Sequence, residues 1–93
     1  MAQRDRTLQE AMTSLNPAQI IAAAKRFFSV ENRSYAAYPE QEGSGYLTLR
    51  GQGGEEIVLN ATASERGTRV SGSSYLFDQQ IARFLSTLPP VAA

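Results

Sequence analysis

The chain has 93 residues, enough for one folded domain with a single hydrophobic core. Its nine basic and nine acidic residues cancel to a formal net charge of zero, which argues against a non-specific binder of nucleic acid or of anionic membranes. It contains no cysteine and no histidine, which excludes disulfides, thiolate metal sites and the commonest general base.

The same sequence lacks the signals of export and of membrane insertion. Its first residues have no apolar signal-peptide core. No apolar run approaches the roughly 20 residues of a membrane-spanning helix. We therefore expect a cytoplasmic protein.

The first 15 residues are predicted to be an arm ahead of the domain. Leu8, Met12 and Leu15 have the spacing of one helical stripe. The arm is expected either to be frayed, as chain termini commonly are, or to form a short helix that docks on a partner subunit. The folded domain is predicted at residues 16–90 and a short tail at residues 91–93.

A first helix is predicted to begin at Asn16 and to end between Phe28 and Val30. Asn16 suits the N-cap, Pro17 suits the first helical position, and Gln19 completes a variant of the capping box. Apolar residues recur on one side, so one helix face is expected to be buried. These residues are Ile20, Ile21, Ala24, Phe27 and Phe28.

Four strands are predicted after this helix, at residues 33–38, 46–51, 56–64 and 68–77. Pro39 is expected to stop the first of them, because proline cannot donate to a sheet ladder, and residues 39–45 are expected to form a loop. In the third strand apolar residues alternate with mostly polar ones, which is typical of a half-buried strand. The alternating apolar residues are Ile57, Leu59, Ala61 and Ala63.

The second and third strands are predicted to form a hairpin with a three-residue loop at residues 52–54. This loop places Leu47 opposite Leu59, on the apolar face of both strands. It also places Arg50 opposite Glu56, a favourable cross-strand pair.

The third and fourth strands are predicted to join through a two-residue turn at Arg66-Gly67. Gly67 would supply the positive φ that such turns require. This turn places Ala63 opposite Val70 and keeps the apolar residues on one face. A shift by one residue would turn that whole face toward water.

Asp78 is predicted to cap a last helix, which Pro89-Pro90 ends. Ile81, Phe84 and Leu85 fall on one apolar stripe. The predicted fold is an α+β two-layer sandwich, in the order helix, four strands, helix. A four-stranded antiparallel meander sheet carries both helices on one face, and the other sheet face is uncovered within one chain.

The uncovered face is rich in hydroxyl groups and nearly free of charge. An ordinary solvated sheet face would explain its polarity, but such a face usually carries more lysine and glutamate, whereas the centre of an interface is depleted of charge. We therefore expect association through this face, as a homodimer or as a subunit of a larger complex. The interface candidates are Tyr46, Thr48, Val58, Asn60, Thr62, Ser71, Ser73 and Tyr75.

Two other binding functions are alternatives. A carrier would hold an apolar small molecule between helices and sheet, lined by Phe27, Phe28, Phe77 and Phe84, although core packing is the simpler role for these rings. The sheet face could instead stack single-stranded RNA, but the neutral chain lacks the flanking basic residues that this use needs.

The sequence argues against an enzyme. Glu40, Glu42, Glu55 and Glu65 lie in predicted loops or beside turns, where carboxylates are usually solvated, and paired-carboxylate catalysis needs groups held by rigid elements. The single lysine, Lys25, falls on the outward face of the first helix, away from any desolvated pocket. We predict no catalytic residue, no metal site and no cofactor.

Overall fold

A computed structural model describes residues 7–31, 36–74 and 77–91 of the chain. These residues form five antiparallel strands and two α-helices, the first of which continues into a short π-helical segment. The elements are β1 (Thr7–Thr13), α1 (Pro17–Arg26), η1 (Phe27–Glu31), β2 (Ala37–Glu42), β3 (Tyr46–Gly51), β4 (Glu56–Ser64), β5 (Gly67–Ser74) and α2 (Asp78–Ser86). The class is α+β, as predicted, but the sheet has five strands where four were expected.

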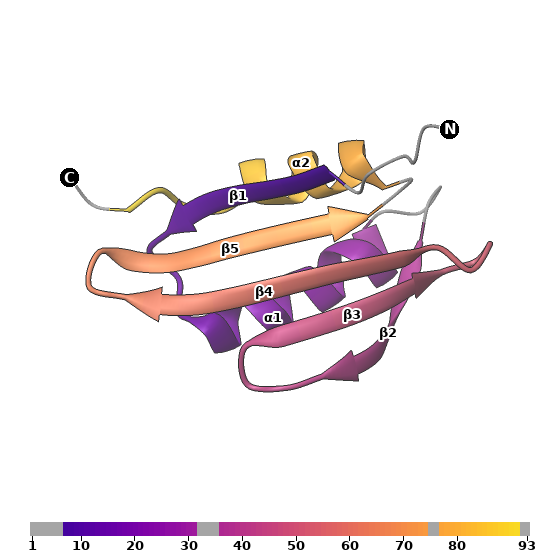
Figure 1. The fold of residues 1–93 in the computed structure, drawn as a ribbon, viewed down its shortest axis with the longest axis horizontal. Helices are drawn as coiled ribbons and strands as arrows, with labels where there is room; N and C mark the ends of the chain where they lie inside the picture. The colour runs from indigo at the N-terminus through magenta and orange to yellow at the C-terminus, as the bar shows by residue number, and fades with distance from the viewer. Residues whose placement is uncertain (1–6, 32–35, 75–76, 92–93) are drawn as a thin grey trace, which may run out of the picture.

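The strands form one sheet in the order β1-β5-β4-β3-β2. Strands β2 to β5 make the predicted meander, and β1 joins it beside β5. Figure 1 looks at the sheet from the side that neither helix covers, with α1 behind β3 and β4 and with α2 behind β1. The molecule therefore has two layers, and α2 packs on β1 and β5 while α1 packs on β4.

Strand β1 corrects the expectation for residues 1–15. Residues 7–13 are neither a frayed arm nor a helix, because they pair with β5 over seven consecutive positions. Leu8 and Met12 are four residues apart, a spacing that fits one face of a strand as well as one face of a helix. The free backbone edge of β5 decides between the two, and that edge is invisible in the local pattern.

Strand β2 also differs from its prediction. It begins at Ala37 and continues through Pro39 to Glu42, so the expected loop is confined to residues 43–45. Pro39 is tolerated because β2 is an edge strand, where a missing N–H need not break the ladder. The register with β3 shifts between Pro39 and Gln41, as in a β-bulge. Of the predicted first strand, residues 33–35 lie outside the described residues.

The β3–β4 hairpin has the predicted register. Leu47 lies opposite Leu59, and Arg50 lies opposite Glu56. Gly51 N donates to Glu55 O at 2.7 Å and closes the three-residue loop. This prediction is confirmed.

The β4–β5 hairpin is offset by two residues from the predicted register. Val70 lies opposite Ala61, two residues earlier than expected, and the turn residues are Glu65-Arg66. Gly67, with φ +136°, is the first residue of β5 and lies just after the turn. An even offset keeps every side chain on its predicted face, so the faces are right although the pairs are wrong.

The core lies between the helices and the inner face of the sheet. Leu59 and Val70 are fully buried, while Asn60 is exposed on the other face. Gly72 lies where β5 meets α2, and a Cβ there would come within 2.9 Å of Ile81. The two layers are therefore in close contact at this point.

Helix α1 begins with the predicted capping box. Asn16 Oδ1 accepts a hydrogen bond from Gln19 N at 2.8 Å, and Gln19 Oε1 accepts one from Asn16 N at 2.9 Å. These bonds satisfy two backbone donors that a helix start otherwise leaves unpaired.

Asn16→Ala should lower the free energy of unfolding by about 1 kcal/mol, because Gln19 N loses its acceptor. Urea denaturation followed by circular dichroism measures the change. Asn16→Asp is the control, since aspartate keeps the acceptor and places a negative charge at the helix N-terminus. Equal losses in both variants would contradict a capping role.

Candidate protein interface on the open sheet face

The open face is the side of the sheet opposite the helices, and all five strands contribute to it. The strand registers align its side chains in four cross-strand rows. The rows are Leu8–Ser73–Val58–Thr48–Gln41, Glu10–Ser71–Asn60–Tyr46, Met12–Arg69–Thr62 and Glu56–Arg50–Tyr38. Neither helix lies over this face (Figure 1).

The structure gathers the described interface candidates on this face. These residues are Tyr46, Thr48, Val58, Asn60, Thr62, Ser71 and Ser73. The eighth candidate, Tyr75, lies outside the described residues. The register offset changes one cross-strand row. Tyr46 and Asn60 lie in the same row as Ser71, whereas the predicted register put Ser73 in that row.

Strands β1 and β2 add residues that the sequence reasoning missed. Leu8 is 63% exposed and Tyr38 is 50% exposed. Met12 is half-buried on the same face. The alternation of Leu8, Glu10 and Met12 with Gln9 and Ala11 is compatible with a strand, but the same residues also fit a helical stripe, so the local sequence could not place them on this face.

Charged groups on the open face lie outside its centre. Arg50 donates to Glu40 Oε1 at 2.7 Å and lies 3.9 Å from Glu56 Oε2. The hydrogen bond to Glu40 and the charge of that carboxylate raise the pKa of Arg50 above its usual value. Glu10 and Arg69 are exposed toward the other sheet edge, and neither pairs with an opposite charge among the described residues. The centre of the face is left uncharged.

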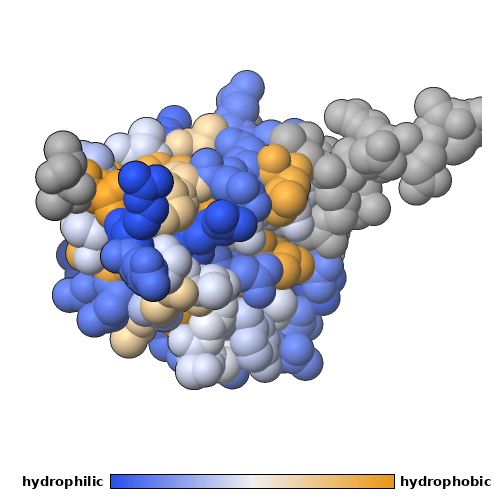
Figure 2. Space-filling view, turned by 60° about the vertical axis from the view of Figure 1, so that its left-hand side comes forward, coloured by the Kyte–Doolittle hydropathy of each residue, from blue (hydrophilic) through white to orange (hydrophobic). Residues whose placement is uncertain are grey.

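The surface at this end of the molecule is mixed in polarity. Figure 2 brings the end of the sheet with the β4–β5 turn forward and shows apolar patches separated by hydrophilic groups. This is the mixed composition of most non-obligate protein interfaces.

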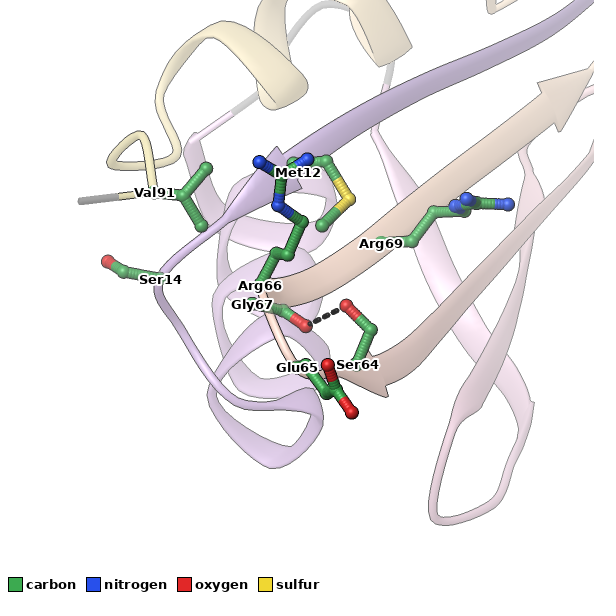
Figure 3. Close-up of a pocket in the computed structure, with 8 residues that line it drawn as sticks. All are labelled: Met12, Ser14, Ser64, Glu65, Arg66, Gly67, Arg69 and Val91. Carbon is green, nitrogen blue, oxygen red and sulfur yellow. Dashed lines mark hydrogen bonds between the residues drawn. The ribbon is translucent and has the colours of Figure 1, made fainter. Parts of the chain in front are cut away.

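An open groove lies beside the β4–β5 turn, between that turn, the end of β1 and Val91 (Figure 3). Arg66 rises over Met12, whereas Arg69 points away along β5. The two guanidinium groups therefore do not converge on a common point. A small-molecule site needs convergent polar groups in a concave pocket, and this groove does not provide them.

The four candidates for an apolar pocket are buried in the core. The Phe27 ring lies 5.0 Å from Phe28 and 5.5 Å from Phe84 between centroids, and the Phe28–Phe84 distance is 5.7 Å. Phe77 is also buried, with 5% of its surface exposed. These contacts favour the core role, and the carrier function stays a prediction.

The carboxylates considered for catalysis are spread over the surface. Glu42 pairs with Lys25 at 2.8 Å, and Glu40 pairs with Arg50. Glu55 Oε1 accepts from Gly53 N at 3.1 Å, and Glu65 is exposed in its turn. Within residues 7–31, 36–74 and 77–91, no three acidic side chains are grouped to hold a metal ion. None of the helices in those ranges combines the length and apolarity of a membrane span.

Comparisons with known proteins give no relative of this chain. No model of a known family, no curated protein and no solved structure matches it. The function is therefore inferred from its own residues and their placement.

Proposed function

We propose that this protein is a non-catalytic domain that acts by protein association through the open face of its sheet, in the simplest case with the same face of a second copy. The observation that carries the proposal is the uncharged centre of a five-stranded sheet face that neither helix covers. Three properties of the face support this function: its size, its composition and its charge balance.

The size of the face suits a specific interface. Five strands spaced about 4.8 Å apart span about 24 Å, and about seven residues at 3.3 Å each span about 23 Å along the strands. The projected area is therefore about 550 Å². Side-chain relief raises the accessible area above this value, toward the roughly 800 Å² per partner of a standard interface.

The composition of the face suits an interface centre. Val58 is flanked by hydroxyl and amide side chains, and Tyr38 and Tyr46 are both more than 40% exposed. Tyrosine is enriched at interfaces because it buries a large ring and keeps a polar tip. Lysine is depleted there, and the single lysine of the chain, Lys25, is on α1.

The charge balance of the face suits a second copy as partner. Its cross-strand rows contain two acidic residues, Glu10 and Glu56, and two basic residues, Arg50 and Arg69. Two such faces can approach without net repulsion. Twofold homodimers are also the commonest oligomers.

Tyr46→Lys combined with Val58→Lys should halve the molar mass of the assembly measured by light scattering after size exclusion. These residues are diagonal neighbours on β3 and β4, and burying their unpaired charges in a contact should weaken it at least about 100-fold. Ala18→Lys combined with Ala22→Lys is the control, because it adds the same charge on exposed positions of α1. Circular dichroism checks that both variants fold. If both double variants keep the molar mass of the parent protein, the proposal is contradicted.

A further inference from the structure

We propose that the free edge of β1 is a second contact surface, where two copies pair their β1 strands antiparallel and join their sheets into one. This surface is distinct from the open face, since it uses backbone hydrogen bonds in the plane of the sheet. It therefore goes beyond the function proposed above.

The two edges of the sheet differ in how they are protected. The outer strand β2 contains Pro39, a register shift between Pro39 and Gln41, and the charged residues Glu40 and Glu42. Proline, bulges and charge are the devices by which proteins prevent edge strands from pairing with another chain. The β2 edge is therefore blocked.

The β1 edge has few of these devices. It runs Thr7–Thr13 without proline, lysine or arginine, and its register with β5 has no shift. Leu8, on this strand, is the most exposed of the large apolar side chains described, at 63%. Figure 1 shows β1 as the outermost strand, with α2 behind it in the helical layer. A regular edge of this kind is a template for a further strand.

The sequence of β1 identifies the partner strand as a second β1. In Thr-Leu-Gln-Glu-Ala-Met-Thr, threonine and a large apolar residue recur at equal distances on both sides of Glu10, whereas Gln9 and Ala11 differ. A twofold axis through Glu10, perpendicular to the sheet, places Leu8 opposite Met12 of the second copy, and the converse pair forms at the same time. Both pairs fall on the open-face side, because the axis preserves the side of each residue. Apolar cross-strand pairs of this kind stabilise antiparallel strands.

The same axis brings the two Glu10 carboxylates opposite each other, and Arg69 offsets this repulsion. Arg69 lies opposite Met12 on β5, one diagonal step from Glu10, and diagonal neighbours are within reach of long side chains. Neither residue forms an ion pair with another described residue, so the Arg69 of each copy is available to the Glu10 of that copy. Across the joint the order is then Arg69, Glu10, Glu10 and Arg69, so each carboxylate has the guanidinium of its own copy within reach.

A single-cysteine variant tests this pairing directly, because the chain contains no cysteine of its own. Residues directly opposite in antiparallel strands have Cα atoms about 4.5–5.5 Å apart, within the range that a disulfide spans. Glu10→Cys should therefore form a covalent dimer as the main product under mild oxidation, read on a non-reducing gel. Ala22→Cys is the control, since Ala22 is exposed on α1, away from both the β1 edge and the open face. Equal cross-linking of the two variants would overturn the proposal.

Charge substitutions provide a second measurement, which depends on the register. Leu8→Lys alone and Met12→Glu alone should each weaken association about tenfold, since each costs two apolar pairs of the symmetric dimer. The double variant should recover to within about threefold of the parent, because the twofold register sets each introduced lysine opposite an introduced glutamate. Circular dichroism checks that the double variant folds. If the folded double variant associates as weakly as the single variants, the proposed register is wrong.

The two proposals can fail separately. The Tyr46→Lys and Val58→Lys changes are on β3 and β4, away from the β1 edge, so adding them to Glu10→Cys should leave its cross-linking intact. Loss of cross-linking in that combined variant would show that the edge contact depends on the open face.

Discussion

Replacing Phe28 by alanine should lower the free energy of unfolding by about 3–5 kcal/mol. Phe28 is fully buried, and its ring packs against Phe27 and Phe84. Truncation removes these contacts and leaves a cavity between η1 and α2. Because a small domain is stabilised by only about 5–15 kcal/mol, urea denaturation followed by circular dichroism should show a large shift or an unfolded variant.

Two further variants keep the Phe28 prediction testable. Phe28→Leu retains most of the buried volume and should cost less than Phe28→Ala, so it should stay folded. Val30→Ala, in the same π-helical segment but 60% exposed, should change the free energy of unfolding by less than about 0.5 kcal/mol. A near-zero effect of Phe28→Ala would indicate that the ring lines open space, as the carrier alternative requires.

Gly67→Ala should lower the free energy of unfolding by about 3 kcal/mol or more, from two causes that add. Gly67 has φ +136°, a conformation that costs an L-residue about 1–3 kcal/mol. A Cβ at this position would also come 2.6 Å from Thr13 O and 2.5 Å from Val91 Cγ1. Overpacking of this kind typically adds about 1–3 kcal/mol.

The contact at Gly67 joins three parts of the chain. Thr13 Oγ1 donates to Pro89 O at 2.6 Å, and Ser14 N donates to the same oxygen at 3.3 Å. The end of β1, the β4–β5 turn and the segment after α2 therefore meet at one place. Displacing Thr13 would loosen all three, which is why a single methyl group is expected to have a large effect.

Gly54→Ala is the matched control for Gly67→Ala. Gly54 also has a positive φ, +93°, but apart from Gly54 itself and its two chain neighbours no described residue has an atom within 4 Å of its would-be Cβ. Its substitution should cost only the backbone strain, about 1–3 kcal/mol. The difference between the two variants measures the contact at Gly67, and equal losses would contradict it.

Several features of this protein were predictable from its sequence alone. The alternation of Ile57, Leu59 and Ala61 with more polar residues predicts which face of β4 is buried, and the structure confirms it for these three residues, whereas Ala63, the fourth of the pattern, is exposed near the turn. The capping box at Asn16 predicts where α1 begins. These signals depend on neighbours within four residues, so local chemistry determines them. The interface candidates on β3 to β5 followed from the same alternation of residues between the two faces. The β4–β5 register was wrong by two residues, and an even offset leaves each residue on its predicted face.

Only the tertiary structure decided how the two sheet edges are formed. The residues of β1 fit a helical stripe and a strand equally well. They form a strand because the edge of β5, more than 50 residues away in sequence, supplies hydrogen-bond partners. Pro39 is a strand breaker in isolation and is accommodated because β2 is the last of the described strands on its side of the sheet. Strand pairing is non-local. A short stretch of sequence therefore does not show which backbone groups of a distant segment are available for hydrogen bonding. The chain therefore determined the start of α1 and its buried face locally, although the N-cap of α2 is Phe77 where Asp78 was predicted. The strand count, the edges and the full extent of the open face depended on long-range pairing.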